Sequence, residues 1–477
     1  MPHFFSWSAR GWTTKYSDRI DIDMSQDQFK RALNTPGVKR VRHRLMSPRL
    51  WLRGLVFWGG SICVGAVAVM FALGAEKAND YLHLLLQASP YLPLLLAPLG
   101  LGAVAWIANR YFVGSQGSGI PQTIAALDSE EARGRVLTLR IAFGKILLTL
   151  VGLSCGASIG REGPTVQVGA AIMHSLGRLV RFSRMHTEKG LILAGGAAGV
   201  AAAFNTPLAG VVFAIEEMSR SIENRTNGII LTGVILAGIT AMAIQGDYPY
   251  FGYTSATLPL NQAWIAVLLC GGACGLLGGL FARLLIAMSR GLPGRAGVLA
   301  RAHPVAFAAG CGFVLALIGL AADSSTYGTG YAEARSLLEG GQQLPMEYGI
   351  LKFVATLVSY ASGIPGGVFA PSLAVGAGFG QNLAQIMPYA PVAAVVLLSM
   401  VGYFAGVVQA PITAFVIVME MTDNHNMVLP LMATALIATA VSRLICPRPL
   451  YHTLAERFLM VRPPSKDAIS QAKSHLP

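Results

Sequence analysis

Charged residues are scarce in this chain, making up 12% of its 477 residues. Soluble domains carry about a quarter, so this composition is not typical of a water-soluble fold. The apolar residues gather instead in long uninterrupted runs, at 54–75, 91–108, 228–245, 264–288 and 427–445. Each run is long enough to cross about 30 Å of hydrocarbon. The sequence therefore predicts a polytopic, all-α membrane protein.

Metal-binding and disulfide patterns are also missing. The six cysteines show no CxxC spacing, the nine histidines are scattered, and no HExxH motif occurs. Such spacings are what disulfide frameworks and zinc sites use. We therefore expect the cysteines to be small packing residues, and we expect no metal and no other cofactor. The same absences argue against an intramembrane enzyme, so the chain is not expected to be an enzyme.

The N-terminal segment 1–53 has none of the features of a signal peptide. It is polar, the apolar run that follows is too long, and no small-residue cleavage site is present. Basic residues outnumber acidic ones in this segment, which favours a cytoplasmic N-terminus next to anionic lipid. The net charge of +13 is spread along the chain, so we do not expect nucleic-acid binding.

Several apolar segments are too short to cross a membrane and are cut by glycine and proline, at 117–127, 160–176, 207–218, 366–380 and 411–421. Backbone that breaks at membrane depth must be buried in protein or line a wet cavity, because lipid cannot satisfy its polar groups. In transporters, broken helices of this kind point their ends at a central substrate site. The pattern indicates a permeation protein with partly spanning helices.

These breaks occur twice. Pro164 begins Pro-Thr-Val-Gln-Val-Gly-Ala and Pro371 begins Pro-Ser-Leu-Ala-Val-Gly-Ala. Pro207 and Pro411 each precede a glutamate, Glu216 or Glu420, by nine residues. The repeat predicts the segment 1–53, a first membrane half at 54–246, a connecting loop at 247–261, a second half at 262–446, and a C-terminal helix with a short cytoplasmic tail at 447–477.

Three short stretches carry the chemistry: Gly117-Ser118-Gly119-Ile120-Pro121, Gly160-Arg161-Glu162-Gly163-Pro164 and Gly366-Gly367-Val368-Phe369-Ala370-Pro371. Proline favours the first turn of a helix, and glycine lets backbone approach a ligand closely. The start of a helix presents unpaired N–H groups and a positive dipole, which suit an anion without any full positive charge. No Gly-Lys-Ser/Thr follows the first stretch, so it is not a nucleotide-binding loop.

These three motifs, in this order, resemble the GSGIP, GREGP and GxFxP signatures of the CLC chloride channels and transporters. The Pro-Leu-Tyr at residues 449–451 is similar to a fourth. The resemblance covers about residues 54–460. It implies the CLC fold, with two inverted structural repeats, and a homodimer in the lipid bilayer with one anion pathway per subunit. It implies chloride and protons as the transported ions, in a chloride/proton antiporter.

The resemblance also implies residue roles. Ser118 and Tyr451 are similar to the family's central hydroxyl donors, and Glu162 looks like its gating and proton-transferring glutamate. Glu217 matches the internal proton-transfer glutamate of the family's exchangers. The anion-binding set that the motifs imply is Ser118, Gly119, Ile120, Arg161, Gly163, Val368, Phe369, Ala370 and Tyr451. Neutral donors can bind a halide and still release it quickly.

Some features depart from the family or leave alternatives open. Gln122 and Ile124 stand where many members have acidic residues, which puts the coupling ratio in doubt. Only 26 residues follow Tyr451 (477 − 451), so we expect no nucleotide-binding module, as in forms from bacterial inner (plasma) membranes. A passive chloride channel gated by Glu162 stays open as an alternative, as does a preference for nitrate or fluoride.

Overall fold

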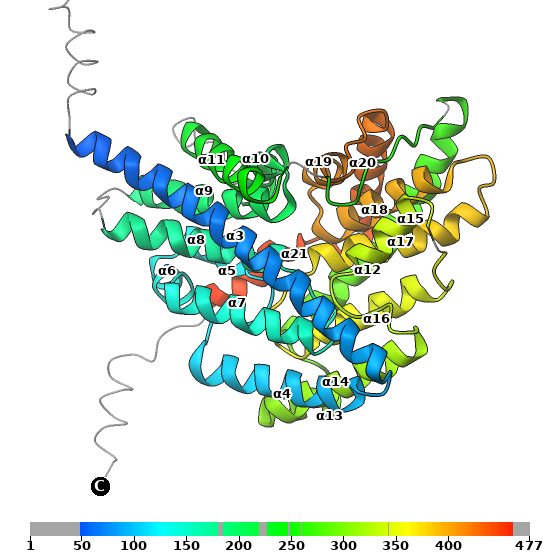
Figure 1. Ribbon diagram of the computed structural model, residues 1–477, viewed down its shortest axis with the longest axis horizontal. Helices are drawn as coiled ribbons and strands as arrows, with labels where there is room; N and C mark the ends of the chain where they lie inside the picture. Colours follow the sequence, from blue (N-terminus) through cyan, green and yellow to red (C-terminus); the bar gives the residue numbers. More distant parts are fainter. Residues whose placement is uncertain are drawn as a thin grey trace, which may run out of the picture. The chain divides into compact units, whose positions relative to one another are not determined.

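The computed structural model describes residues 48–460, except 180–184, 219–226, 247–248, 259 and 342. The helices described from Val56 onward belong to one compact unit. The described residues are helical, with isolated bridges but no β-strand among them (Figure 1). The prediction of an all-α polytopic protein is confirmed. The predicted segment 1–53 lies mostly outside the described residues.

The first predicted half contains the following helices, where η1 is a π-helical turn: α3 (Pro48–Ala88), α4 (Pro93–Tyr111), α5 (Ile120–Asp128), α6 (Glu130–Val136), α7 (Leu139–Ser154), α8 (Glu162–Leu179), α9 (Met185–Phe204), α10 (Pro207–Phe213), η1 (Ala214–Met218) and α11 (Asn227–Gln245). The short helices α5, α8 and α10 begin at the glycine and proline motifs, as predicted. The switch from α10 into the π-helical turn was not predicted.

The second predicted half contains α12 (Leu260–Arg290), α13 (Gly294–Ala302), α14 (Pro304–Ala321), α15 (Tyr331–Leu338), α16 (Tyr348–Ala361), α17 (Phe369–Gln385), α18 (Val392–Val408), α19 (Pro411–Thr422) and α20 (Val428–Ile445), and α21 (Leu450–Met460) follows it. Helix α11 ends and α12 begins close to the expected connecting loop. The division into domains itself stays a prediction.

Five described helices are long and apolar enough to cross a membrane, or six if the bent pair α6–α7 is one span. Four of the five predicted runs lie in such helices. The fifth, at 228–245, forms α11, whose apolar part Ile230–Gln245 is shorter than a full crossing. The span Pro304–Ala321 was not singled out from the sequence, although its 18 residues have a hydropathy similar to that of the other spans.

Packing between helices repeats in the two halves. Helix α8 packs on α9 and α7 in the first half, as α17 packs on α18 and α16 in the second. In the same way, α9 contacts α10 and α11, and α18 contacts α19 and α20 (Figure 1). A duplicated sequence pattern thus corresponds to a duplicated packing pattern, so the two halves are structural repeats.

The two repeats also cap each other's helices. The carboxylate of Glu420, near the end of α19, accepts the N–H groups of Leu208 (3.1 Å) and Ala209 (2.6 Å) at the start of α10. Glu216, at the end of the α10–η1 segment, accepts the N–H groups of Ile412 (3.1 Å) and Thr413 (2.6 Å) at the start of α19. Reciprocal contacts of this kind are what a twofold axis between repeats produces.

Candidate functional site

The starts of α5, α8 and α17 meet at a set of glycine contacts that join the two halves. Gly160 and Gly367 exchange two backbone hydrogen bonds, each of 2.7 Å. The amide of Gly117 donates to the carbonyl of Ile364, and the amide of Gly366 donates to the carbonyl of Gly117, both at 3.1 Å. The first and third motifs are about 250 residues apart in the sequence. The folded chain brings all three motifs together into one site.

Glycine is required where two of these motifs touch. A Cβ on Gly163 would lie 2.4 Å from the hydroxyl oxygen of Ser118. Gly119 has a φ of 109°, and a Cβ there would lie 2.6 Å from the carbonyl oxygen of Gly163. Neither distance is possible for a real side chain, and the positive φ adds strain for any residue with a Cβ. The close approach of α5 to α8 therefore depends on these two glycines.

Two hydroxyl groups point into the centre of this site. The side chains of Ser118 and Tyr451 are 3% and 0% exposed, and the two hydroxyls lie near one another. Among the described residues, neither hydroxyl oxygen has a hydrogen-bond partner. Buried polar groups in folded proteins are nearly always paired. Two buried, convergent donors without protein partners indicate a site that receives a hydrogen-bond acceptor.

Aromatic packing fixes the position of Tyr451. Its ring lies 5.7 Å from the ring of Phe369, which is itself 4.8 Å from Phe404 and 6.0 Å from Phe213. Val368 caps α17, and Phe369 and Ala370 form its first turn, all three buried. The predicted residues of the second half therefore lie beside the hydroxyl pair.

One predicted donor at the start of α5 is occupied by the protein itself. The amide of Gly119 donates to the side-chain oxygen of Gln122 at 3.0 Å, and the Gln122 amide donates to the carbonyl of Gln116 at 2.5 Å. Gln122 thus caps the start of α5. Ile120 begins α5 and is buried, next to this cap.

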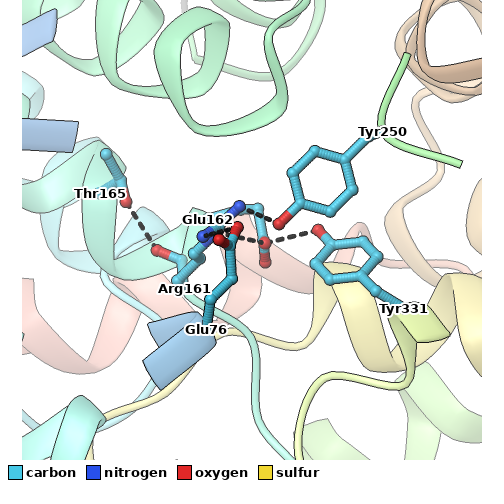
Figure 2. Close-up of polar contacts among 6 residues, drawn as sticks. All are labelled: Glu76, Arg161, Glu162, Thr165, Tyr250 and Tyr331. Atoms are coloured by element: carbon cyan, nitrogen blue, oxygen red, sulfur yellow. Dashed lines mark hydrogen bonds and ion pairs between the residues drawn. The ribbon is translucent and has the colours of Figure 1, made fainter. Parts of the chain in front are cut away.

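Glu162 lies at the start of α8 and is fully buried, as Figure 2 shows. Its Oε1 accepts a hydrogen bond of 2.5 Å from the hydroxyl of Tyr331 and lies 3.9 Å from Nε of Arg161. Its other oxygen has no hydrogen-bond partner among the described residues, and the backbone of Ala370, at the start of α17, lies close to the carboxylate. The carboxylate therefore lies beside the Tyr331 hydroxyl and two helix starts, which suit a negative charge.

Arg161 is 2% exposed and directs its guanidinium toward the hydroxyl of Tyr250 (Figure 2). It contacts the hydroxyl of Tyr250 and lies 3.5 Å from a carboxylate oxygen of Glu76. The backbone carbonyl of Arg161 accepts a hydrogen bond of 2.8 Å from Thr165. The positive charge of Arg161 is thus held by its own protein partners beside the glutamate.

Two cavities approach the site. One of about 480 Å³ is lined by residues that include Glu76, Arg161 and Tyr331, and we call it the Tyr331 cavity. Another of about 420 Å³ is lined by residues that include Ser118 and Gln122. Glu162 contacts residues of the first cavity, and Ser118 lies against the helix that Glu162 begins. Each cavity is thus lined in part by a different motif, the first by Arg161 and the second by Gly117 and Ser118.

Glu217 lies in the π-helical turn η1 and is 3% exposed. Its backbone carbonyl accepts a hydrogen bond of 2.9 Å from Nε2 of His452, the residue after Tyr451. Its carboxylate is close enough to Tyr451 for the charge to act on that hydroxyl. The structure therefore brings Glu217 to the same end of the site as Tyr451. Single π-helical turns within α-helices are frequent at functional sites.

Sequence reasoning missed two buried lysines that support the site. Lys145 of α7 donates to the carbonyls of Ser115 (2.7 Å) and Gly117 (2.6 Å). Lys352 of α16 donates in the same way to three carbonyls, of Thr326 (2.9 Å), Tyr327 (3.3 Å) and Gly328 (2.9 Å). The two lysines are 207 residues apart (352 − 145), the spacing that also separates Pro164 from Pro371. That spacing is the signal that could have found them.

The same comparison reveals a fourth glycine motif. Gly328-Thr329-Gly330-Tyr331 precedes and begins α15, as Gly117-Ser118-Gly119-Ile120 precedes and begins α5. Tyr331 therefore takes the place in the second half that Ile120 has in the first. Among the described residues, no group of three or more His, Cys, Asp or Glu side chains could hold a metal ion.

Comparison with known proteins gives consistent matches over most of the chain. Residues 100–443 match the sequence family described as voltage gated chloride channel. The chain is 32% identical over 454 residues to the H(+)/Cl(-) exchange transporter ClcA of Citrobacter koseri, covering 86% of this chain and 89% of that protein. A transporter of the same name from Salmonella paratyphi A is 32% identical over 450 residues, covering 88% and 86%.

Solved structures give the same result. The structure of a slow cyanobacterial Cl-/H+ antiporter superposes with a TM-score of 0.74 at 26% identity, covering 86% of this chain and 98% of that one. A CLC-type fluoride/proton antiporter shares the fold, with a TM-score of 0.70 at 23% identity over 84% of this chain and 98% of the other.

Proposed function

We propose a transport function from one premise, that this chain belongs to the voltage-gated chloride channel family, the CLC family. The chain is a multi-pass membrane protein that exchanges chloride for protons. The observation that carries this proposal is a fully buried carboxylate, Glu162, placed at two helix starts beside the hydroxyls of Ser118 and Tyr451. A transporter of this kind performs no covalent chemistry on its substrate, so we propose no enzymatic activity and no cofactor.

Chloride binds between the hydroxyls of Ser118 and Tyr451 and the first backbone amides of α8 and α17. The amides are those of Arg161 to Gly163 and of Val368 to Ala370, with that of Ile120 from α5. Because Gln122 occupies the amide of Gly119, Gly119 contributes through its backbone conformation. The donors are neutral, so they hold the anion weakly enough for it to leave.

Glu162 couples chloride to protons by competition. An ionised carboxylate and a halide both favour the positive end of a helix dipole, so they compete for one position. When a proton neutralises Glu162, the carboxyl loses this attraction and leaves the pathway open to chloride. A membrane-buried charge is costly and marks a functional site. Proton binding from one side is thus coupled to anion movement in the opposite direction.

Glu217 delivers protons to Glu162 from the other end of the site. Its carboxylate acts on Tyr451 and its backbone carbonyl accepts a hydrogen bond from His452, so the proton route we propose reaches the site at the Tyr451 end. The Gln122 cap removes one acidic residue that many relatives have near this path. Proton delivery in this chain is therefore served by fewer carboxylates.

One chain contains all the proposed site residues, which supports one complete pathway in each subunit, and we propose a homodimer on the resemblance to the CLC family. The ClcA relatives come from bacteria, and we infer a bacterial inner membrane as the location. Cross-linking of the detergent-solubilised protein should give a dimer, and a purely monomeric profile at transport-active concentrations would contradict the assembly.

The test is a paired measurement in liposomes. Vesicles loaded with high chloride are diluted into low chloride at equal pH, with a potassium ionophore to set the potential. We expect chloride efflux to drive proton uptake in the unmodified protein, because the two movements share Glu162. Efflux without proton uptake would identify a passive channel instead.

Two variants test the residues. Glu162→Ala and Glu217→Ala should each pass chloride without moving protons uphill. The matched control is Glu216→Gln, an adjacent glutamate that caps α19, which should remain coupled. Uphill proton movement in Glu162→Ala would disprove its gating role, and full coupling in Glu217→Ala would assign the proton path to another group.

A further inference from the structure

Tyr331 makes a direct contact with the gating carboxylate. It is the first residue of α15, and its hydroxyl donates to Oε1 of Glu162 at 2.5 Å (Figure 2). Arg161 also lies near that oxygen, with its Nε 3.9 Å away. The Tyr331 hydroxyl is therefore the nearer donor of the two. It comes from the second half, whereas Glu162 belongs to the first.

Neighbouring rings hold the Tyr331 hydroxyl in place. The Tyr331 ring lies 4.3 Å from that of Tyr250 and 5.3 Å from that of Phe251. Tyr250 in turn contacts the guanidinium of Arg161, which lies 5.1 Å from the Tyr250 ring centre. The two tyrosines thus contact the two members of the Arg161–Glu162 pair, one each, and Figure 2 shows both hydroxyls pointing toward this pair.

We propose that Tyr331 is a positioning residue whose hydroxyl holds ionised Glu162 in its buried position, a contact that we call the latch. This contact sets the pH at which the gate opens. The inference rests on the gating role proposed above for Glu162. A hydrogen bond to an ionised carboxylate is shorter and about twice as strong as one between neutral groups. The Tyr331 hydroxyl therefore stabilises the ionised, closed state more than the protonated, open state.

Other charged and titratable groups face Glu162, and the design of the test leaves them unchanged. Arg161 lies next to it in the chain, and Tyr451 of α21 lies close enough to interact. Further groups line the Tyr331 cavity from α3 and α15: Glu76, Asp80, His83, Glu333 and Arg335. Because none of these is altered by a change at Tyr331, a shift in the pH profile reports on the lost hydroxyl.

The variant Tyr331→Phe removes the hydroxyl and keeps the ring that packs on Tyr250 and Phe251. Chloride flux should rise as pH falls, because protonation opens the gate, and its half-activation should move up by about one pH unit in Tyr331→Phe. At a fixed pH above that midpoint, chloride flux should increase by up to about tenfold. An unchanged midpoint would overturn the latch.

The matched control is Tyr327→Phe. Tyr327 lines the same cavity, but its hydroxyl donates to the carbonyl of Ala316 at 3.3 Å. Its midpoint should equal that of the unmodified protein. Equal shifts in both phenylalanine variants would show that any lost hydroxyl in the cavity has this effect, and would overturn the specific role of Tyr331.

A Glu162→Gln background separates failure of the latch from failure of the proposed function. If Glu162 is the gate, Glu162→Gln loses the pH activation, and adding Tyr331→Phe then changes nothing. If Glu162→Gln keeps the activation, the gating proposal itself is wrong. The protonation of the Glu162 carboxyl can be read directly from infrared difference spectra between Tyr331→Phe and the double variant that also carries Glu162→Gln. If Glu162 titrates in Tyr331→Phe at the same pH as in the unmodified protein, the latch is also overturned.

Discussion

The reciprocal caps between the two repeats lead to a quantitative prediction. Glu420→Ala removes both acceptors at the start of α10. A hydrogen bond to a charged group contributes about 1.5–3 kcal/mol. Leu208 is 50% exposed, so water can replace part of the hydrogen bond that its amide donates to Glu420. We therefore assign the full free energy only to the hydrogen bond from the Ala209 amide. The expected loss of stability is about 2–3 kcal/mol.

Glu216→Ala should cost more than Glu420→Ala. The Glu216 carboxylate accepts a third bond, of 2.8 Å, from the hydroxyl of Thr413. The loss should therefore be about 3–5 kcal/mol, and Thr413→Val alone should cost about 1 kcal/mol. Of the three variants, Thr413→Val should therefore be the most stable to unfolding, Glu420→Ala the next and Glu216→Ala the least stable.

The assay is thermal unfolding of the detergent-solubilised protein at one fixed scan rate, because membrane proteins often unfold irreversibly. The matched control is Glu456→Ala, at an exposed carboxylate on α21, which should unfold with the unmodified protein. If Glu216→Ala and Glu420→Ala also unfold at that temperature, the carboxylates do not hold the two repeats together, and the energetic reasoning is refuted.

Two further predictions concern the anion site. Ser118→Pro should shift preference away from chloride, because it deletes a central hydroxyl donor; an unchanged anion series in vesicle flux would contradict this role. Lys352→Met and Lys145→Met should both lower the unfolding temperature, since each buried carbonyl left without a donor costs about 1–3 kcal/mol. Only Lys145→Met should also weaken chloride binding in calorimetry, because its acceptors Ser115 and Gly117 precede Ser118; equal affinity in both variants would argue against this.

Much of the fold follows from local patterns. Long apolar runs predicted most spans, and the glycine and proline breaks predicted where α5, α8, α10, α17 and α19 begin. The span Pro304–Ala321 was missed, although it is apolar over 18 residues and the signal that predicted the other spans could have found it. The duplicated proline motifs predicted the repeat, which the recurrence of helix packing confirms.

The candidate site was predictable only in part. The glycine and proline motifs indicated Ser118 and Glu162, because the residues that place an anion-binding group at a helix start are neighbours in the sequence. Tyr331 could not be predicted in the same way, since its contact with Glu162 joins residues 169 positions apart. Lys145 was hidden because a lysine in an apolar run resembles a residue at a span boundary, and only its carbonyl partners explain its burial.

The paired hydrogen bonds between Gly160 and Gly367 restrict how such a machine can move. Many carriers expose their cargo alternately by rocking one repeat against the other. Here such rocking would have to break these bonds, because each repeat supplies one of the two glycines. We therefore expect access to the site to change through rotations of individual side chains while the backbone of the two repeats stays joined.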